Sequence, residues 1–359
     1  MKRLIYITIL SILLPLGCSK PSPAPAPAPE QYARYLFFSH GVETKASLIE
    51  DVDDMDGKSF GVVGFKYDFD KKWETEKTTA TPNVFADTPE TVDVSADGTN
   101  TTVGVGSYTP LQGWSNSKKY AFFAYFPLDN STVSLVNTDG SDYTGGVPAI
   151  RYTMDPTSGE AFRTSMEDVM TAPAQIDKFW KSSAEDGNNV DNGEVNFTFE
   201  HRLSCLGLNL KNSSAAGITV NSVTFNLSGI QYQSITIPLD GSTRTSEGPA
   251  VDIDCALQVV DGGIAVPSVS TDPKGVEVPD KLILIPQTLA LGFTVTVGYT
   301  RTLDSYEPIQ TSFTTASVST ALTEGKKHIV YLNFKDSTVD VELKCGPWAE
   351  SHTIDNTFN

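Results

Sequence analysis

The sequence predicts a nearly all-β protein made of two antiparallel β-sandwiches in tandem. Residues typical of strands, namely Thr, Val, Ser and the aromatic residues, are abundant, and no long stretch repeats its apolar residues with the period of a helix. Apolar and polar residues instead alternate over short segments, of which 195–205 is the clearest. A strand of this kind buries one face, so a second sheet is needed to cover it.

Residues 1–18 are typical of an export signal. Lys2 and Arg3 precede an apolar run, residues 4–16, that is too short to span a bilayer. With Cys18 following, the order resembles a bacterial lipoprotein signal, which predicts cleavage before Cys18 and acylation of its thiol. The acyl chains would then hold the mature protein on a membrane. The alternative is an ordinary secretory signal in which Cys18 has no role.

A spacer rich in Pro and Ala, residues 19–31, follows the signal. It has too little apolar surface to form a core, and its prolines favour an extended backbone. We expect it to lift the folded part off the membrane. No later segment is apolar for long enough to span a bilayer.

Two kinds of strand are expected in the folded part. Segments that alternate, with one face buried, are 195–205, 223–227, 293–299 and 339–345, whereas 120–126, 282–285 and 329–334 are apolar on both faces and are expected in sheet interiors. After Cys205 the apolar residues change from odd to even positions. A β-bulge or sharp bend near 205–207, where Gly207 lies, would reconcile the two runs.

One short helix and one domain boundary complete the predicted architecture. Residues 161–172 have helical character and end before Pro173. The polar stretch 182–193 is rich in Asn, Asp, Gly and Ser and is typical of a linker. The predicted domains are therefore 32–185 and 186–359.

Charge and cysteine content exclude several classes of partner. The net charge is −18, and removal of Lys2 and Arg3 with the signal makes it −20 (24 basic and 44 acidic residues). Nucleic acid and anionic lipid surfaces require a basic face, so neither is expected as a partner. After Cys18, the remaining cysteines allow at most one disulfide, and buried thiols are the alternative; these are Cys205, Cys255 and Cys345.

No catalytic, cofactor or metal site is expected. The four histidines form no H-E-x-x-H motif, and neither G-x-S-x-G nor a phosphate-binding Gly-rich loop is present. His201 lies on the apolar face of its strand, which favours a hydrogen-bonded core histidine. The acidic run 50–57 does not fit an EF-hand loop, because Val52 and Val63 would occupy ligand positions. A solvated acidic turn is favoured over a calcium site of another kind.

Several segments spread over most of the mature chain resemble those of one known family. Their order and spacing, together with the lipoprotein signal, carry the likeness. The segments are 44–46, 59–65, 120–127, 167–170, 197–210 with His201, 282–287 and 325–328. They are similar to segments of the fimbrillin-like proteins of Bacteroidales, which are the subunits of lipoprotein-derived pili.

The resemblance implies two transthyretin-like domains and assembly by donor-strand exchange. In such pili a trypsin-like protease removes the first strand of a precursor, and a strand of a neighbouring subunit fills the groove. Here the cut would fall between Lys45 and Ala46, although family members commonly have Arg at the first position, which leaves the protease open. The displaced strand would be 32–44, which contains Tyr35, Leu36, Phe37 and Phe38. The alternative is that 32–45 is a permanent strand of the first domain.

The donor strand is expected near the C-terminus. Residues 349–359 are mostly polar, whereas 339–345 alternates and offers Val339, Val341 and Leu343 on one face. A stalk subunit both gives and receives a strand, a tip subunit only receives one, and an anchor subunit only gives one. The sequence leaves these three roles open.

The predicted function is that of a non-enzymatic structural or adhesive subunit of a cell-surface fimbrium, held in the outer membrane by acylated Cys18. Its expected partners are other fimbrial subunits, outer-membrane lipid and a receptor on a host or bacterial surface, without nucleic acid. The alternative is a surface glycan-binding lipoprotein that does not polymerise, in which tryptophans stack on sugars. The four tryptophans are Trp73, Trp114, Trp180 and Trp348.

Overall fold

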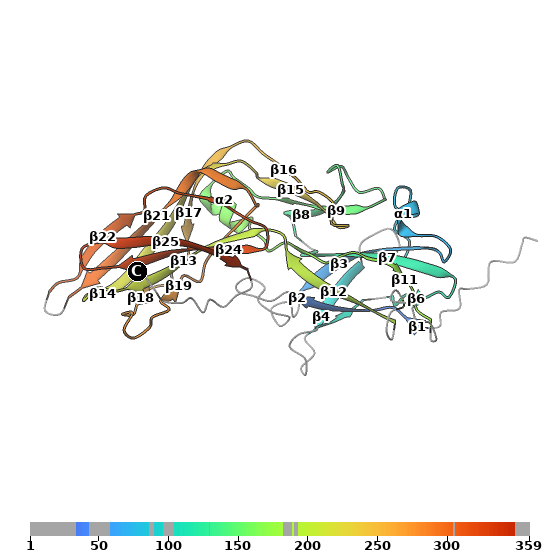
Figure 1. Ribbon diagram of the computed structural model, residues 1–359, viewed down its shortest axis with the longest axis horizontal. Helices are drawn as coiled ribbons and strands as arrows, with labels where there is room; N and C mark the ends of the chain where they lie inside the picture. The colour runs from blue at the N-terminus through green and yellow to red at the C-terminus, as the bar shows by residue number, and fades with distance from the viewer. Residues whose placement is uncertain are drawn as a thin grey trace, which may run out of the picture. The chain divides into compact units, whose positions relative to one another are not determined.

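The computed structural model describes residues 34–42, 58–85, 90–95, 104–108, 110–128, 130–181, 189, 193–303 and 306–348. Apart from two short helices, the regular structure of these residues consists of strands, and most strand pairings are antiparallel (Figure 1). The predicted all-β class is therefore confirmed. Within the described part of the chain, no helix is long and apolar enough to cross a membrane.

The first large sheet has eight strands in the order β10-β12-β2-β5-β4-β3-β7-β11. Because β10 pairs with β7 as well as with β12, seven of these strands close into a ring. The pairing of β12 with β2 is parallel, which alternation alone does not predict. The strands are β2 (Phe37–Val42), β3 (Ser59–Asp68), β4 (Glu90–Ser95), β5 (Gly104–Ser107), β7 (Lys118–Phe126), β10 (Met170–Thr171), β11 (Gln175–Lys178) and β12 (Glu194–His201).

Two smaller sheets also contain residues of the N-terminal half. A two-stranded sheet pairs β1 (Arg34–Tyr35) with β6 (Gly113–Trp114). A four-stranded sheet has the order β16-β15-β9-β8. Its strands are β8 (Val133–Asn137), β9 (Pro148–Thr153), β15 (Ser234–Pro238) and β16 (Thr245–Glu247).

The remaining strands form a five-stranded and a six-stranded sheet. In the five-stranded sheet, the order is β19-β13-β24-β25, and β20 also pairs with β13. In the six-stranded sheet, the order is β17-β14-β21-β22, β18 also pairs with β14, and β23 also pairs with β21. The strands are β13 (Ser204–Asn212), β14 (Gly217–Ile230), β17 (Val251–Leu257), β18 (Ile264–Val266), β19 (Val276–Glu277), β20 (Leu282–Leu284), β21 (Thr288–Thr302), β22 (Ile309–Thr314), β23 (Val318–Ala321), β24 (Lys326–Phe334) and β25 (Val339–Pro347).

The described residues contain two short helices, whereas the sequence pattern predicts one longer helix. The first, α1, spans Trp73–Glu76, and the second, α2, spans Gly159–Thr164. The hydroxyl of Ser158 caps α2 by accepting a hydrogen bond from the Ala161 amide at 3.0 Å. The expected helix over 161–172 therefore ends eight residues early, because Met170 and Thr171 form β10 between β12 and β7.

The bulge expected near 205–207 is not present. The pairing of β13 with β24 continues without a shift over eight residues, and every residue of β13 is buried. The change in apolar parity between Cys205 and Leu206 falls inside β13, which is buried on both faces, so apolar residues there occupy odd and even positions alike. Close packing explains the glycine at position 207, because a Cβ atom there would lie 2.8 Å from the Cδ1 of Ile329.

Strand pairing crosses the division expected at residues 185 and 186. β12, β15 and β16 follow this point in the sequence, yet β12 pairs with β2 and β15 pairs with β9. One core cluster includes residues from Val63 to Trp348, whereas a second cluster, rich in aromatic residues, lies within the strands of the eight-stranded sheet and its neighbours. The two-domain division remains a prediction.

Candidate functional site: the seat of the N-terminal strand

β2 is an interior strand of the eight-stranded sheet. Its residues pair in parallel with β12, from Phe37 opposite Glu194 to Val42 opposite Phe199, and antiparallel with β5 on the other side. The preceding residue, Leu36, donates its amide to the Gln112 carbonyl at 2.8 Å. Removal of this strand would therefore leave two ladders of backbone groups unpaired.

The side chains of Leu36, just before β2, and of Phe38, within it, are fully buried: Leu36 is 0% exposed and Phe38 is 1% exposed. The Phe38 ring lies against four aromatic rings, with its centroid 5.4 to 6.0 Å from theirs, and it stacks on Phe197 at an interplanar angle of 22°. The other three rings belong to Phe85, Tyr108 and Phe122. We call this pocket the Phe38 socket. Burial of a Leu or Phe side chain is worth about 1.5–3 kcal/mol, so both side chains hold the strand in place.

Tyr108 fixes the backbone at the same point. Its hydroxyl donates to the Leu36 carbonyl at 3.1 Å and accepts the Gln112 amide at 3.2 Å. The side-chain oxygen thus joins the entry of the N-terminal strand to the loop that precedes β6. Sequence reasoning missed Tyr108, because nothing in its local pattern connects it to a segment more than seventy residues earlier.

The other residues of the proposed processing site are only partly described. Tyr35 lies in β1, opposite Gly113, and Phe37 begins β2. Cys18, Lys45 and Ala46 lie outside the described residues, as does the acidic run 50–57. The lipidation and cleavage assignments therefore remain predictions.

β25, the candidate donor strand, lies at the edge of the five-stranded sheet. It pairs with β24 over nine residues, and among the described residues no strand pairs with its other side. Val341 is 38% exposed, whereas Val339 and Leu343 are half-buried and pack against the core. Release of β25 would break one ladder rather than two, which is the property that a donor strand requires.

Trp348 follows β25 and is 1% exposed. Its ring stacks on that of His201, with centroids 4.5 Å apart and planes 3° apart, and its amide donates to the Gly325 carbonyl at 3.0 Å. The Nδ1 of His201 lies 2.8 Å from an Asp168 oxygen, and both side chains are 4% exposed. The prediction of a hydrogen-bonded core histidine is therefore confirmed. The cluster also ties the end of β25 to the end of β12.

A buried ion cluster lies in the same sheet as β25. The Nζ atoms of Lys327 and Lys281 lie 2.6 and 2.9 Å from the Glu277 carboxylate, and the two lysine side chains are only 2% and 6% exposed. Burial raises the pKa of Glu277, but the ion pairs lower it more, and the net shift is downward.

The three cysteines among the described residues, Cys205, Cys255 and Cys345, are free thiols. Cys205 and Cys255 are buried, which raises their pKa values to about 12 and about 11. Cys345 is exposed. Among the described residues, no group of three or more His, Cys, Asp or Glu side chains is placed to hold a metal ion.

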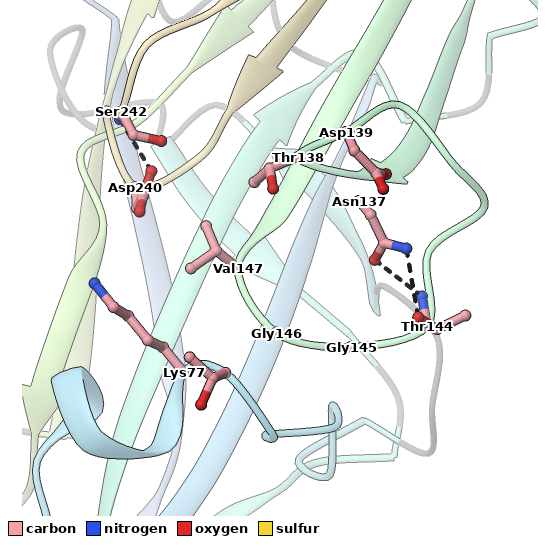
Figure 2. A pocket seen from close by; sticks show the side chains of 11 residues that line it. Lys77, Asn137, Thr138, Asp139, Thr144, Gly145, Gly146, Val147, Asp240 and Ser242 are labelled. Carbon is pink, nitrogen blue, oxygen red and sulfur yellow. Dashed lines mark hydrogen bonds between the residues drawn. The ribbon is translucent and has the colours of Figure 1, made fainter.

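A polar hollow of about 550 Å³ lies between the loop after α1, the β8–β9 loop and the turn after β15 (Figure 2). Many of its polar groups bind their own loops. Asn137 accepts the Thr144 amide at 3.2 Å, Asp139 accepts the Ser141 amide at 3.0 Å, and Asp240 accepts the Ser242 amide at 2.9 Å, as Figure 2 shows for the first and third. These bonds shape the loops, so we assign the hollow no ligand.

The fold and this seat define a class of β-sandwich protein in which an N-terminal strand lies buried inside a sheet. The chain belongs to the fimbrillin-like family, whose model matches residues 68–348. Its fold is similar to that of a fimbrial protein from Bacteroides vulgatus, with 18% identity and a TM-score of 0.59 over 86% of this chain and 99% of the other. A Bacteroides ovatus protein described as a cell adhesion protein has 14% identity and a TM-score of 0.50 over 89% and 98%. No curated protein matches the chain significantly.

Proposed function

We propose that the chain is a non-enzymatic structural or adhesive subunit of a cell-surface fimbrium, in which a strand of a neighbouring subunit replaces β2. Membership of the fimbrillin-like family supports the fimbrial part of the proposal. The observation that most supports strand exchange is the seat itself: β2 pairs on both sides, and Phe38 fills a socket of four aromatic rings. An empty seat would expose unpaired backbone and apolar rings, so it would bind another strand.

The proposed route begins with export and lipidation at Cys18, which places the precursor on the outer membrane. A protease then cuts between Lys45 and Ala46, and the segment that contains Tyr35, Leu36 and Phe38 leaves. Other fimbrial subunits are the proposed partners, and a surface receptor is the proposed target of adhesion. No residue is assigned a catalytic role.

β25 is the proposed donor. Among the described strands it pairs with β24 alone, and its apolar residues Val339, Val341 and Leu343 lie on alternating positions, as a replacement for β2 requires. Its exit requires Trp348 to leave the His201 ring, so this stack would hold the donor strand until assembly.

Limited trypsin digestion of the folded chain from residue 19 onward tests the proposal. We expect one early cut, a fragment that begins at Ala46, and higher oligomers in size-exclusion chromatography. A Lys45→Gln variant is the matched control and should keep its N-terminal strand and form none of the higher oligomers that follow cleavage. Resistance at Lys45, or a cut chain that forms no larger oligomer than the uncut chain does, would contradict strand exchange and favour a tip, an anchor or a glycan-binding lipoprotein.

The glycan-binding alternative loses the observation on which it rested. Trp73, Trp114 and Trp348 are 0–1% exposed, so none offers a face to a sugar. Trp180 is partly buried and packs against the aromatic core cluster. No other observation among the described residues favours this function.

A further inference from the structure

The six-stranded sheet has one edge that is open and uncharged. β21 pairs with β14 on one side, and on the other side it pairs first with β23, over 288–293, and then with β22, over 296–301. β22 and β23 thus form one margin of the sheet. Among the described residues, no strand pairs with their outer side. We call this margin, residues 309–321, the β22–β23 edge.

The composition of the β22–β23 edge is unusual for a chain with a net charge of −18. From Ile309 to Thr323 the sequence contains no Asp, Glu, Lys, Arg or Pro. The first four residues of β22 are exposed. Soluble proteins normally protect exposed edges with charges, prolines or bulges, because an unprotected edge pairs with other chains.

Other edges of this protein do carry such protection. β17, at the opposite margin of the same sheet, exposes Asp252 and Asp254. The edge strand β25 contains Asp340 and Glu342, and β16 ends at the exposed Glu247. The lack of charge at the β22–β23 edge is therefore a local feature and does not reflect the composition of the chain.

Exposed apolar side chains gather around the same edge. Seven large apolar side chains are well exposed in the described part of the chain, and four of them lie on or beside β21 and β22. Tyr306, 74% exposed, precedes β22. Leu291 of β21, 70% exposed, has its carbonyl bonded to the Ser317 hydroxyl at 3.0 Å, and its side chain lies over Gly229 of β14. The other two are Leu303 and Ile309.

We propose that the β22–β23 edge pairs antiparallel with the same edge of a second copy of this chain. Two chains that are both strongly acidic repel each other, and an uncharged edge is where they can approach at low electrostatic cost. A two-fold axis between Thr311 and Ser312 would pair residues 309–314 of the two copies, a segment without charged residues. The exposed Ile309 of each copy would then be covered, and the interface would have the symmetry usual for dimers.

This inference is independent of strand exchange, so its test uses a chain that cannot be cleaved. Sedimentation equilibrium of the Lys45→Gln chain, from residue 19 onward, should show a monomer–dimer equilibrium. The double variant Gln310→Glu with Ser312→Glu places four carboxylates at the dimer axis. Like charges facing each other across strands are unfavourable, so we expect the dissociation constant to rise at least about tenfold.

A control with the same added charge is Thr245→Glu with Ala256→Glu, at exposed positions of β16 and β17. This control should dimerise as the parent does, and all variants should melt at similar temperatures because every substituted side chain is exposed. A parent that remains monomeric at all concentrations would overturn the proposal. So would a dimer that is insensitive to Gln310→Glu with Ser312→Glu, or one that the control weakens equally.

Discussion

Replacement of Phe38 by Ala tests whether the Phe38 socket holds the N-terminal strand. The side chain is 1% exposed and lies within 6.0 Å of four aromatic rings, measured between centroids. Truncation of a fully buried Phe costs about 3–5 kcal/mol, through lost burial and the cavity that remains. Each 1.4 kcal/mol is a factor of ten, so a strand already cut from the chain after Lys45 should bind roughly 10² to 4 × 10³ times more weakly.

The assay follows release of the N-terminal peptide from a chain cut after Lys45, by size-exclusion chromatography and mass spectrometry. The matched control is Phe225→Ala in β14, because Phe225 is also 0% exposed but belongs to the other core cluster. Both variants should lower the stability of the intact chain, but only Phe38→Ala should release the peptide faster. Equal release from wild type and Phe38→Ala, or faster release from Phe225→Ala, would refute the role given to the socket.

Three further predictions concern the C-terminal strands. Trp348→Ala should expose the end of β25 to limited proteolysis at Lys344, because the stack on His201 is lost, and the cut can be located by mass spectrometry. Glu277→Gln should lower the free energy of unfolding at pH 7 by about 1–3 kcal/mol, since it leaves the buried Lys327 without its carboxylate; Glu277 is itself about one-third exposed, which limits the effect. Because the folded pKa of Glu277 lies below its ordinary value of 4.5, its contribution is present above that pH and is lost on acidification through the lowered pKa. Urea unfolding at several pH values should therefore show a smaller acid-dependent loss in Glu277→Gln. Finally, of the three thiols only the exposed Cys345 should react with Ellman's reagent in the native protein, and the two buried thiols should react only after unfolding.

Alternation in the sequence predicts which segments are strands, but it does not predict their partners. Residues 120–126 and 329–334, apolar on both faces, do lie in sheet interiors as β7 and β24. The parallel pairing of β12 with β2 joins residues more than 150 positions apart, and local residue types do not encode such a choice. The parity change after Cys205 shows the same limit, because a bulge within a strand and a strand buried on both faces give the same pattern.

The candidate site was predictable where it depended on local chemistry. A buried, hydrogen-bonded His201 follows from its place on the apolar face of an alternating strand, whereas the strand that contains 35–38 was implied by the family resemblance. The socket around Phe38 did not follow, because its rings come from four separate segments of the chain. The hydrogen bond between Asp168 and His201 was likewise not predictable from the sequence, because the two residues come together only where the short strand β10 pairs with β12.

The two residues between β12 and β13, Arg202 and Leu203, have a mechanical meaning for a subunit in a filament. β12 runs parallel to β2 over six paired residues, and β13 runs parallel to β24 over eight. If a neighbour's strand lies in the place of β2, and β25 lies in the next subunit, tension enters along the strand axes at both ends. The hydrogen bonds of each ladder then bear the shear force at the same time, instead of breaking one after another. The short covalent link, Arg202 and Leu203, transmits the force between the two sheets. A fibre of such subunits should stretch little under flow until a whole ladder slips at once.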